Sequence, residues 1–196
     1  MGKFRRIETG LEGIVIAVPA IFHDARGFFL ETYNKAELGE IGIRDVFVQD
    51  NQSSSGKGVI RGLHFQRQHP QVKLVRVLSG IIYDVVVDIR RGSPTYGRYE
   101  GFFLSADENH MLYVPVGFAH GFMALVDGTI VLYKVSDYYH PESDDGIVWN
   151  DPSLDIAWPL GQFNIRNTVV SEKDGELPLL EDIDSPFVYR NGTAND

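Results

Sequence analysis

His120–Val135 has the sequence His-Gly-Phe-Met-Ala-Leu-Val-Asp-Gly-Thr-Ile-Val-Leu-Tyr-Lys-Val. It divides into two apolar runs, 120–126 and 129–135, around the dipeptide Asp127-Gly128. Both runs have the length and composition of β-strands. Asp-Gly is a strong signal for a tight turn between antiparallel strands, because such turns need residues that tolerate a positive φ. The stretch therefore predicts a β-hairpin and favours an all-β fold.

Similar runs continue on both sides of this stretch. Runs 73–78 and 81–89 flank Ser79-Gly80 and predict a second hairpin. Asn34 can cap a short helix that extends to about Glu40. With these runs the chain has about ten short, mostly antiparallel strands, which predict a sandwich or a jelly-roll barrel with a few short helices. The remaining predicted strands are 14–18, 24–33, 45–51, 59–66, 99–105 and 110–114, and 53–58 is predicted to be an exposed loop.

Length and charge limit what the protein can be. With 196 residues and 43% hydrophobic side chains, we expect a single domain over residues 1–185 and a frayed tail at 186–196. The formal charge of −9 argues against a nucleic-acid polymer as partner, because like charges repel. The absence of cysteine excludes disulfides and thiolate zinc sites. No apolar run has the length of a secretion signal or a membrane span, so we expect a cytoplasmic protein without a membrane partner.

The run Val59-Ile60-Arg61-Gly62-Leu63-His64-Phe65-Gln66 places two polar side chains in an apolar strand. His64 can exchange a proton near neutral pH, and Arg61 is a fixed cation suited to phosphate. A hydrogen-bonded core histidine is the alternative interpretation of His64. In a regular strand the two side chains would point to opposite faces. If both face one site, the strand must be irregular between them, and Gly62 is the expected position.

The run Pro115-Val116-Gly117-Phe118-Ala119-His120-Gly121-Phe122 resembles the second motif of the cupin superfamily, proline-x-glycine-x-x-histidine. This resemblance implies a cupin-type double-stranded jelly-roll barrel. The first motif of metal-binding cupins supplies two histidines and a glutamate, whereas His64-Phe65-Gln66 supplies one histidine. Two imidazoles without a nearby carboxylate make a poor metal site. His69 and His110 lie in turn-like contexts. We therefore expect a barrel with neither a metal nor another cofactor.

Further segments, in order along the chain, resemble the dTDP-4-dehydrorhamnose 3,5-epimerase family. The similarity extends from about Gly13 to Leu180. It implies inversion of the two carbons beside the keto group of dTDP-4-dehydro-6-deoxy-D-glucose, which yields dTDP-4-dehydro-L-rhamnose for a cell-surface polysaccharide. The segments are Asp24–Gly27, Phe47–Asn51, Arg61–Gln66, Asp84–Arg90, Gly117–Phe122, Tyr133-Lys134 and Ser171–Asp174.

The resemblance implies catalytic roles for four residues. His64 is the base, Asp174 orients its imidazole, and Tyr133 is the acid on the other side of the sugar ring. Lys73 is the cation at the developing enolate oxygen. Without the resemblance, Asp174 and Lys73 are ordinary surface residues and Tyr133 is an ordinary core tyrosine.

The resemblance also implies a substrate-binding set. Forked cations suit diphosphate oxygens, and an aromatic ring with amides suits a nucleobase. The family forms homodimers in which strands pass between subunits, so a residue near Phe28 can serve the partner's site. The diphosphate set is Arg26, Arg61 and Lys173; the nucleoside set is Phe29, Glu31, Gln49 and Asn51; the sugar set is Asp84, His120 and Tyr139.

Three alternatives remain open from the sequence. The first is an epimerase that acts at only the 3- or the 5-position of a related dTDP-keto sugar. The second is a non-catalytic cupin that binds sugar nucleotides, which would need no His-Asp pair. The third is a metal-dependent cupin oxygenase or isomerase.

Overall fold

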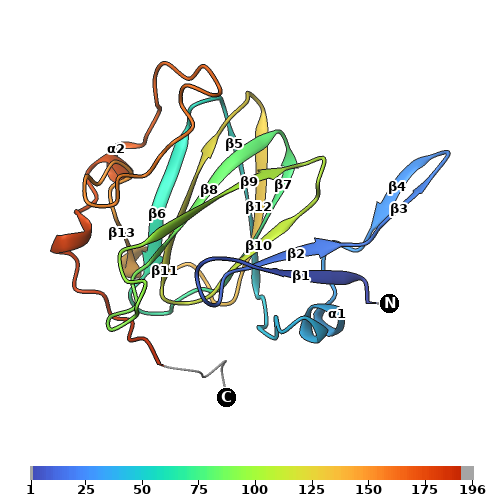
Figure 1. Cartoon of the computed structure of the whole chain (residues 1–196), viewed down its shortest axis with the longest axis horizontal. Coiled ribbons are helices and arrows are strands. Elements are labelled where there is room, and N and C mark those ends of the chain that lie inside the picture. The colour runs from blue at the N-terminus through green and yellow to red at the C-terminus, as the bar shows by residue number, and fades with distance from the viewer. Residues whose placement is uncertain (1, 191–196) are drawn as a thin grey trace.

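The computed structural model describes residues 2–190 as two facing antiparallel sheets (Figure 1). One sheet has six strands in the order β1-β2-β10-β7-β12-β5, and the other has five in the order β13-β6-β11-β8-β9. The predicted all-β jelly-roll barrel is therefore confirmed. The strands of the first sheet are β1 (Phe4–Glu8), β2 (Val15–Pro19), β5 (Gln49–Ser55), β7 (Lys73–Ser79), β10 (Met111–Val114) and β12 (Thr129–Val135). Those of the second are β6 (Ile60–Gln66), β8 (Ile81–Asp88), β9 (Tyr99–Ser105), β11 (Phe118–Ala124) and β13 (Asp144–Gly146).

Both predicted hairpins are wrong in the same way. The chain reverses at Gly80 and at Gly128, which have φ values of 81° and 68° as the turns require. However, β7 and β8 belong to different sheets, and so do β11 and β12. A glycine turn makes the chain reverse but does not determine which strands pair. Here each turn carries the chain from one layer of the barrel to the other.

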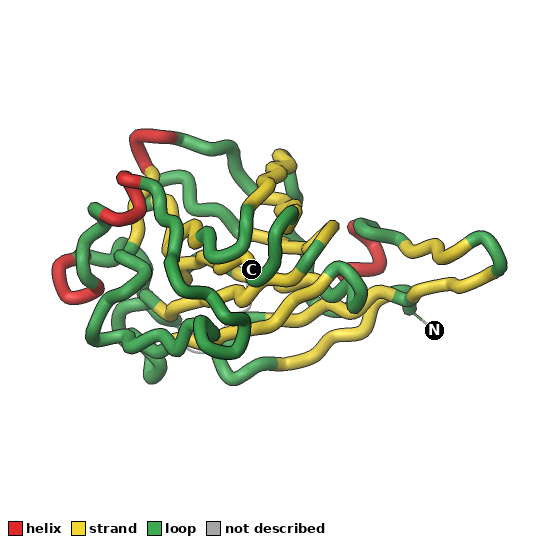
Figure 2. The backbone as a smooth tube through the Cα atoms, turned by 90° about the horizontal axis from the view of Figure 1, so that it is seen from above, coloured by secondary structure: helices red, strands yellow, loops and turns green. Residues whose placement is uncertain are grey.

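Apolar side chains fill the space between the sheets and cover both outer faces. Val75 and Val131 of the first sheet share an inner cluster with Val86 and Phe122 of the second. Side chains from the loops after β13 cover the outer face of the five-stranded sheet, and Figure 2 shows long loops packed against the strands of the barrel. The short helices are α1 (Lys35–Glu40), α2 (Glu172–Gly175), η1 (Pro141–Ser143) and η2 (Leu180–Asp182).

Helix α1 begins where the sequence predicts. The side chain of Asn34 accepts hydrogen bonds from the backbone N–H groups of Ala36 and Glu37, and the helix ends at Glu40. Leu38 of this helix packs with Tyr113 and Met111 on the outer face of the six-stranded sheet. Among the described residues, no helix is both long and apolar enough to cross a membrane.

Strands β1, β3 (Ile21–Asp24) and β13 were not predicted, several strand ends differ by one to three residues, and two further stretches differ more. Strand β5 covers Gln49–Ser55, so it includes serines predicted to lie in a loop and leaves out 45–48. Its pairing with β12, from Gln49–Val135 to Ser55–Thr129, outweighs the weak strand propensity of serine. In the predicted tail, residues 191–196 lie outside the described part of the chain. Residues 187–189 are hydrogen-bonded to Arg91 and lie against the domain.

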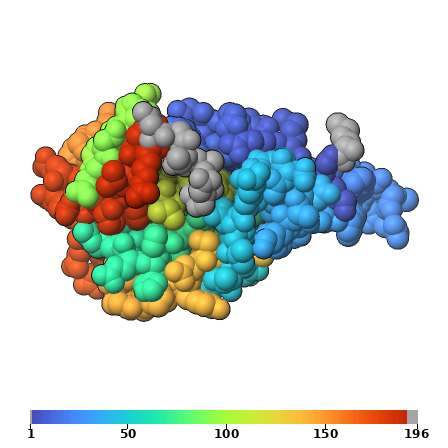
Figure 3. All heavy atoms as spheres, turned by 90° about the horizontal axis from the view of Figure 1, so that it is seen from below, coloured from blue at the N-terminus to red at the C-terminus, as the bar shows by residue number. Residues whose placement is uncertain are grey.

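A two-stranded arm projects from the barrel. Strands β3 (Ile21–Asp24) and β4 (Gly27–Leu30) pair only with each other, and the arm extends away from the body in all three views (Figures 1, 2 and 3). Phe22, Phe28 and Phe29 on this arm are 55%, 59% and 66% exposed. Such a group of exposed aromatic rings is typical of a surface that another chain covers.

Candidate active site

Four polar side chains lie on the inner face of the five-stranded sheet. His120 and Phe122 of β11 are two residues apart and share that face. His64 of β6 lies opposite His120, and Arg61 lies opposite Phe122. On the other side of β11, Asp84 of β8 also lies opposite Phe122. Residues opposite each other in a sheet point to the same face. His64, Arg61, Asp84 and His120 therefore converge between the sheets.

The irregularity predicted at Gly62 is present. Three residue steps separate Arg61 from His64, but two separate their partners Phe122 and His120, so β6 has one extra residue. Gly62 has a φ of 122°, and a Cβ atom there would lie 2.5 Å from the Cα of Gly121. Only glycine allows this conformation and this close approach. The bulge is what brings Arg61 and His64 to the same face.

We expect Gly62→Ala to lower the free energy of unfolding by about 3 kcal/mol, because it adds a backbone clash to the strain of a positive φ. Gly27→Ala is the matched control. Gly27 has a φ of 126°, but a Cβ atom there would meet nothing within 4 Å. This control should lose about 1 kcal/mol or less. Urea unfolding measures both values, and equal losses would show that the contact with Gly121 does not matter.

His64 is paired with Asp174. The imidazole Nε2 lies 2.8 Å from Asp174 Oδ1, and Asp174 Oδ2 accepts a hydrogen bond of 3.0 Å from the Gly62 N–H. The Ser171 side chain caps helix α2 and holds the Asp174 N–H at 3.1 Å. Burial alone would raise the pKa of the Asp174 carboxyl, but the bonds from His64 and Gly62 outweigh it and hold the pKa below its usual value.

This pairing makes His64 suitable as a base. When Nε2–H donates to the carboxylate, Nδ1 keeps its lone pair and can accept a proton. The Asp174 carboxylate then stabilises the imidazolium that forms. The His64 side chain is 31% exposed, so a ligand can reach it. Asp174 and His64 are 110 residues apart in sequence, and the fold brings them together as the family resemblance implies.

A second His-Asp pair lies deeper. His120 Nε2 is 2.9 Å from both carboxylate oxygens of Asp84, and both residues are buried. Burial raises the pKa of the Asp84 carboxyl, although His120 and Lys73 oppose this. Lys73 donates a 3.2 Å hydrogen bond to the backbone carbonyl of His64. Burial lowers the pKa of Lys73 to about 8, against the pull of Asp144 and Asp84. Its ammonium therefore lies beside the His64 backbone and releases its proton at a lower pH than an ordinary lysine.

We expect stability to rise with pH because of Lys73. Between the folded pKa of about 8 and the ordinary 10.5, the unfolded chain holds a proton that folded Lys73 has released. The free energy of unfolding therefore increases with pH in this window. Lys73→Met lacks this contribution. From about pH 7.5 to about pH 9.5, the wild type should gain about 2 kcal/mol relative to the variant. Urea unfolding of both proteins at the two pH values measures this difference. An equal change in the free energy of unfolding of the two proteins would disprove the prediction.

The six-stranded sheet contributes the other half of the site. Tyr133 of β12 lies opposite Val75 on one side and Asn51 on the other, so it shares the inner face of that sheet. Burial raises the pKa of the Tyr133 hydroxyl, with Arg61 opposing it, so the phenol keeps its proton at neutral pH. Gln49 donates a hydrogen bond of 2.8 Å to Asn51. These side chains face the sheet that carries His64.

Asp144 belongs to this group, although no pattern in the sequence predicts it. This residue lies in the short strand β13, opposite Gln66 of β6, and its side chain is 10% exposed. Its Oδ2 accepts a 3.1 Å hydrogen bond from the Tyr139 hydroxyl and a salt bridge from Lys173. It therefore joins two predicted binding residues. Asp144 stands in an acidic loop-like stretch, and no sequence pattern distinguishes it from its neighbours.

Three predicted binding residues lie apart from this group within the chain. Arg26 is on the arm, 89% exposed at its side chain, and paired with Asp24. Phe29 is also on the arm, and Glu31 at its base is held by Lys3 and Asn34. The arm extends away from the barrel (Figure 1). The chain thus brings together the residues predicted for the sugar but not Arg26, Phe29 and Glu31.

The chain is similar to known proteins of one enzyme family. The family model of dTDP-4-dehydrorhamnose 3,5-epimerase matches residues 8–182. The enzyme of that name from Methanothermobacter thermautotrophicus is 51% identical over 174 residues, which are 89% of this chain and 93% of the relative. A crystal structure of dTDP-6-deoxy-D-glucose-3,5-epimerase from Legionella pneumophila, in complex with dTDP-4-keto-L-rhamnose, is 45% identical with a TM-score of 0.90. That match covers 95% of this chain and 99% of the other.

The likeness extends to a more distant enzyme. The structure of a 3'-monoepimerase from Streptomyces bikiniensis, in complex with dTDP-quinovose, is 31% identical with a TM-score of 0.82. It covers 88% of this chain and 86% of the other. The family model and the two long matches, at 45% and 51% sequence identity, all point to one family of isomerases. The chain therefore belongs to the dTDP-4-dehydrorhamnose 3,5-epimerase family.

Proposed function

We propose that this enzyme inverts both carbons beside the keto group of dTDP-4-dehydro-6-deoxy-D-glucose, with His64 as base and Tyr133 as acid. The hydrogen-bonded pair of His64 and Asp174 carries the proposal, because it supplies an imidazole held by a carboxylate on the inner face. Tyr133 supports it from the facing sheet, since it supplies a protonated phenol. Inversion needs one group to remove a proton and another to return one from the opposite side.

The remaining residues can stabilise the negative charge that the reaction develops and bind the rest of the substrate. Removal of a proton beside a ketone leaves an enolate, and a cation near its oxygen lowers the barrier. Lys73 is the cation beside His64. The buried pair of His120 and Asp84 borders the same inner face and binds the sugar. Gln49 and Asn51 contact the nucleoside, Arg61 and Lys173 hold the diphosphate, and Tyr139 lines the sugar pocket.

The direct test is an assay with dTDP-4-dehydro-6-deoxy-D-glucose and a reductase that consumes the L-rhamno product. The proposal expects steady oxidation of the reductant and an NMR spectrum of the L-rhamno configuration. A product inverted at one carbon only would reject double epimerisation. The binding of dTDP without any exchange of the two carbon-bound hydrogens would reject catalysis altogether.

A mono-epimerase is the second candidate. The likeness to the Streptomyces bikiniensis enzyme favours it, because that fold carries inversion at one position. The lower identity of that match, 31% against 45–51% for the double epimerases, weighs against it. The number of inverted centres in the product distinguishes the two.

We also propose that the protein is a homodimer in which the β3–β4 arm enters the partner's site. Arg26 and Phe29 are too far from the barrel to help their own site, and the aromatic rings of the arm are exposed in the single chain. The arm would bring a diphosphate-binding cation and a base-stacking ring to the partner. The cytoplasmic location likewise remains a proposal, which cell fractionation tests.

Mixing two inactive variants tests the exchange of arms. His64→Ala removes the base of one site, and Arg26→Ala with Phe29→Ala removes the arm contacts. Each homodimer should have little activity. After the two are unfolded together and refolded, half of the mixed dimers' sites combine an intact arm with an intact base, so activity should return to about a quarter of the wild-type value per site. No recovery, with mixed dimers confirmed by mass spectrometry, would reject the exchange.

A further inference from the structure

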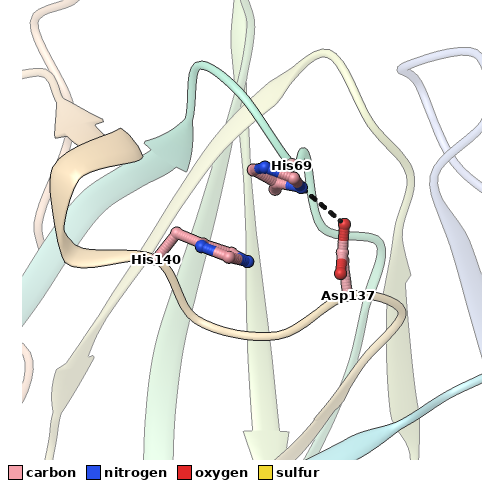
Figure 4. Close-up of side chains that lie close together, drawn as sticks. All are labelled: His69, Asp137 and His140. Atoms are coloured by element: carbon pink, nitrogen blue, oxygen red, sulfur yellow. Dashed lines mark ion pairs between the residues drawn. The ribbon is translucent and has the colours of Figure 1, made fainter.

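Two loops at the barrel rim bring together His69, Asp137 and His140 (Figure 4). One nitrogen from each imidazole and one carboxylate oxygen all lie within 4.8 Å of one another. His69 Nδ1 is 3.4 Å from Asp137 Oδ2. The two imidazole rings stack with centroids 4.1 Å apart and planes at 18°. None of the three residues is among those proposed above for epimerisation.

The amide side chains of two glutamines fix the two loops. Gln66 is 4% exposed; its Nε2 donates to the His69 carbonyl, and its Oε1 accepts a 2.7 Å hydrogen bond from the His140 N–H. Gln71 Nε2 donates a 2.8 Å hydrogen bond to the Asp137 carbonyl. The backbone at all three side chains is therefore held in place. A site positioned in this way loses little conformational entropy when it binds a ligand.

Glu142 orients one of the imidazoles. Its Oε1 lies 3.2 Å from His140 Nδ1. When Nδ1–H donates to this carboxylate, the other ring nitrogen keeps its lone pair, and Figure 4 shows the ring extending toward Asp137. A carboxylate behind a histidine is the usual support of a metal-binding imidazole, because it fixes the tautomer and makes the ring more basic.

We propose that His69, Asp137 and His140 bind one divalent transition metal of the zinc type, with water as the fourth ligand. Two imidazoles and a carboxylate favour zinc over magnesium or calcium, which prefer oxygen ligands. Ligand atoms of a tetrahedral zinc ion lie about 3.4 Å apart, given bonds of about 2.0–2.1 Å. The His69–Asp137 separation already has this value. The His69 side chain is 51% exposed, so a metal ion can reach it from solvent.

The test uses the untagged full-length protein, with Co²⁺ as a spectroscopic probe and Zn²⁺ in calorimetric titrations near neutral pH. The wild type should bind one ion per chain and give the visible absorption of tetrahedral Co²⁺. His69→Ala and His140→Ala should each weaken binding at least tenfold, and Glu142→Gln should weaken it up to about tenfold. His110→Ala is the matched control, since that histidine lies 3.9 Å from Glu108 but outside the cluster. It should bind like the wild type.

Two results would overturn the proposal. One is no binding by the wild type at millimolar Co²⁺ or Zn²⁺. The other is equal affinity in the wild type, His69→Ala and His140→Ala. Thermal unfolding without metal shows whether each variant keeps its fold. Asp137→Asn offers a further variant with the same shape, which should also bind at least tenfold more weakly.

Discussion

His64→Ala should lower kcat by about 10³-fold or more while the affinity for dTDP changes little. The substitution removes the base but leaves the proposed nucleotide contacts of Gln49 and Asn51 on the other sheet. It also leaves Asp174 with its hydrogen bond from the Gly62 N–H, so the local fold keeps its support. Steady-state assays and calorimetry with dTDP measure the two effects. A variant that keeps more than about a tenth of the activity would show that another group is the base.

Tyr133→Phe should separate proton removal from inversion. The variant keeps His64 and its partner Asp174, so it should still exchange the substrate's acidic hydrogens for deuterium in heavy water. Without the phenol, no proton arrives from the opposite face, and formation of the inverted product should fall about 10²-fold or more. NMR of the recovered sugar measures both rates.

Tyr83→Phe is the control for this experiment. Tyr83 is a buried tyrosine in β8 that packs on the outer face of the five-stranded sheet. Removal of the Tyr83 hydroxyl should leave the rate of formation of the inverted product unchanged. If Tyr133→Phe inverts the sugar as fast as Tyr83→Phe, the acid is a different group.

The strands were predictable because their apolar runs are long and well bounded. The predicted run 99–105 matches β9 residue for residue, and Asn34 caps α1 as expected. Pairing was not predictable from the turns. A dipeptide such as Asp127-Gly128 can reverse the chain either within a hairpin or between two layers of a barrel. The strands that pair with β11 and β12 come from distant parts of the chain.

The site was predictable where local geometry decides it. The parity of Arg61 and His64 required an irregularity, and the bulge at Gly62 supplies it. Asp174 was reached only through the family resemblance, because nothing local marks an acid that pairs with a residue 110 positions away. Asp144 was missed for the same reason. Its importance depends on Tyr139 and Lys173, which only the folded chain brings to it.

The most direct measurement is the number of deuterons that the wild-type enzyme places in its substrate in heavy water, with His64→Ala in parallel. If the His64 imidazole removes the proton from both carbons, the wild type should place one deuteron at each of the two positions beside the ketone. The variant should place none at either position over the same time. Exchange by His64→Ala at the wild-type rate would contradict the assignment of His64 as the base, and deuterium at one carbon only would contradict its action at both positions.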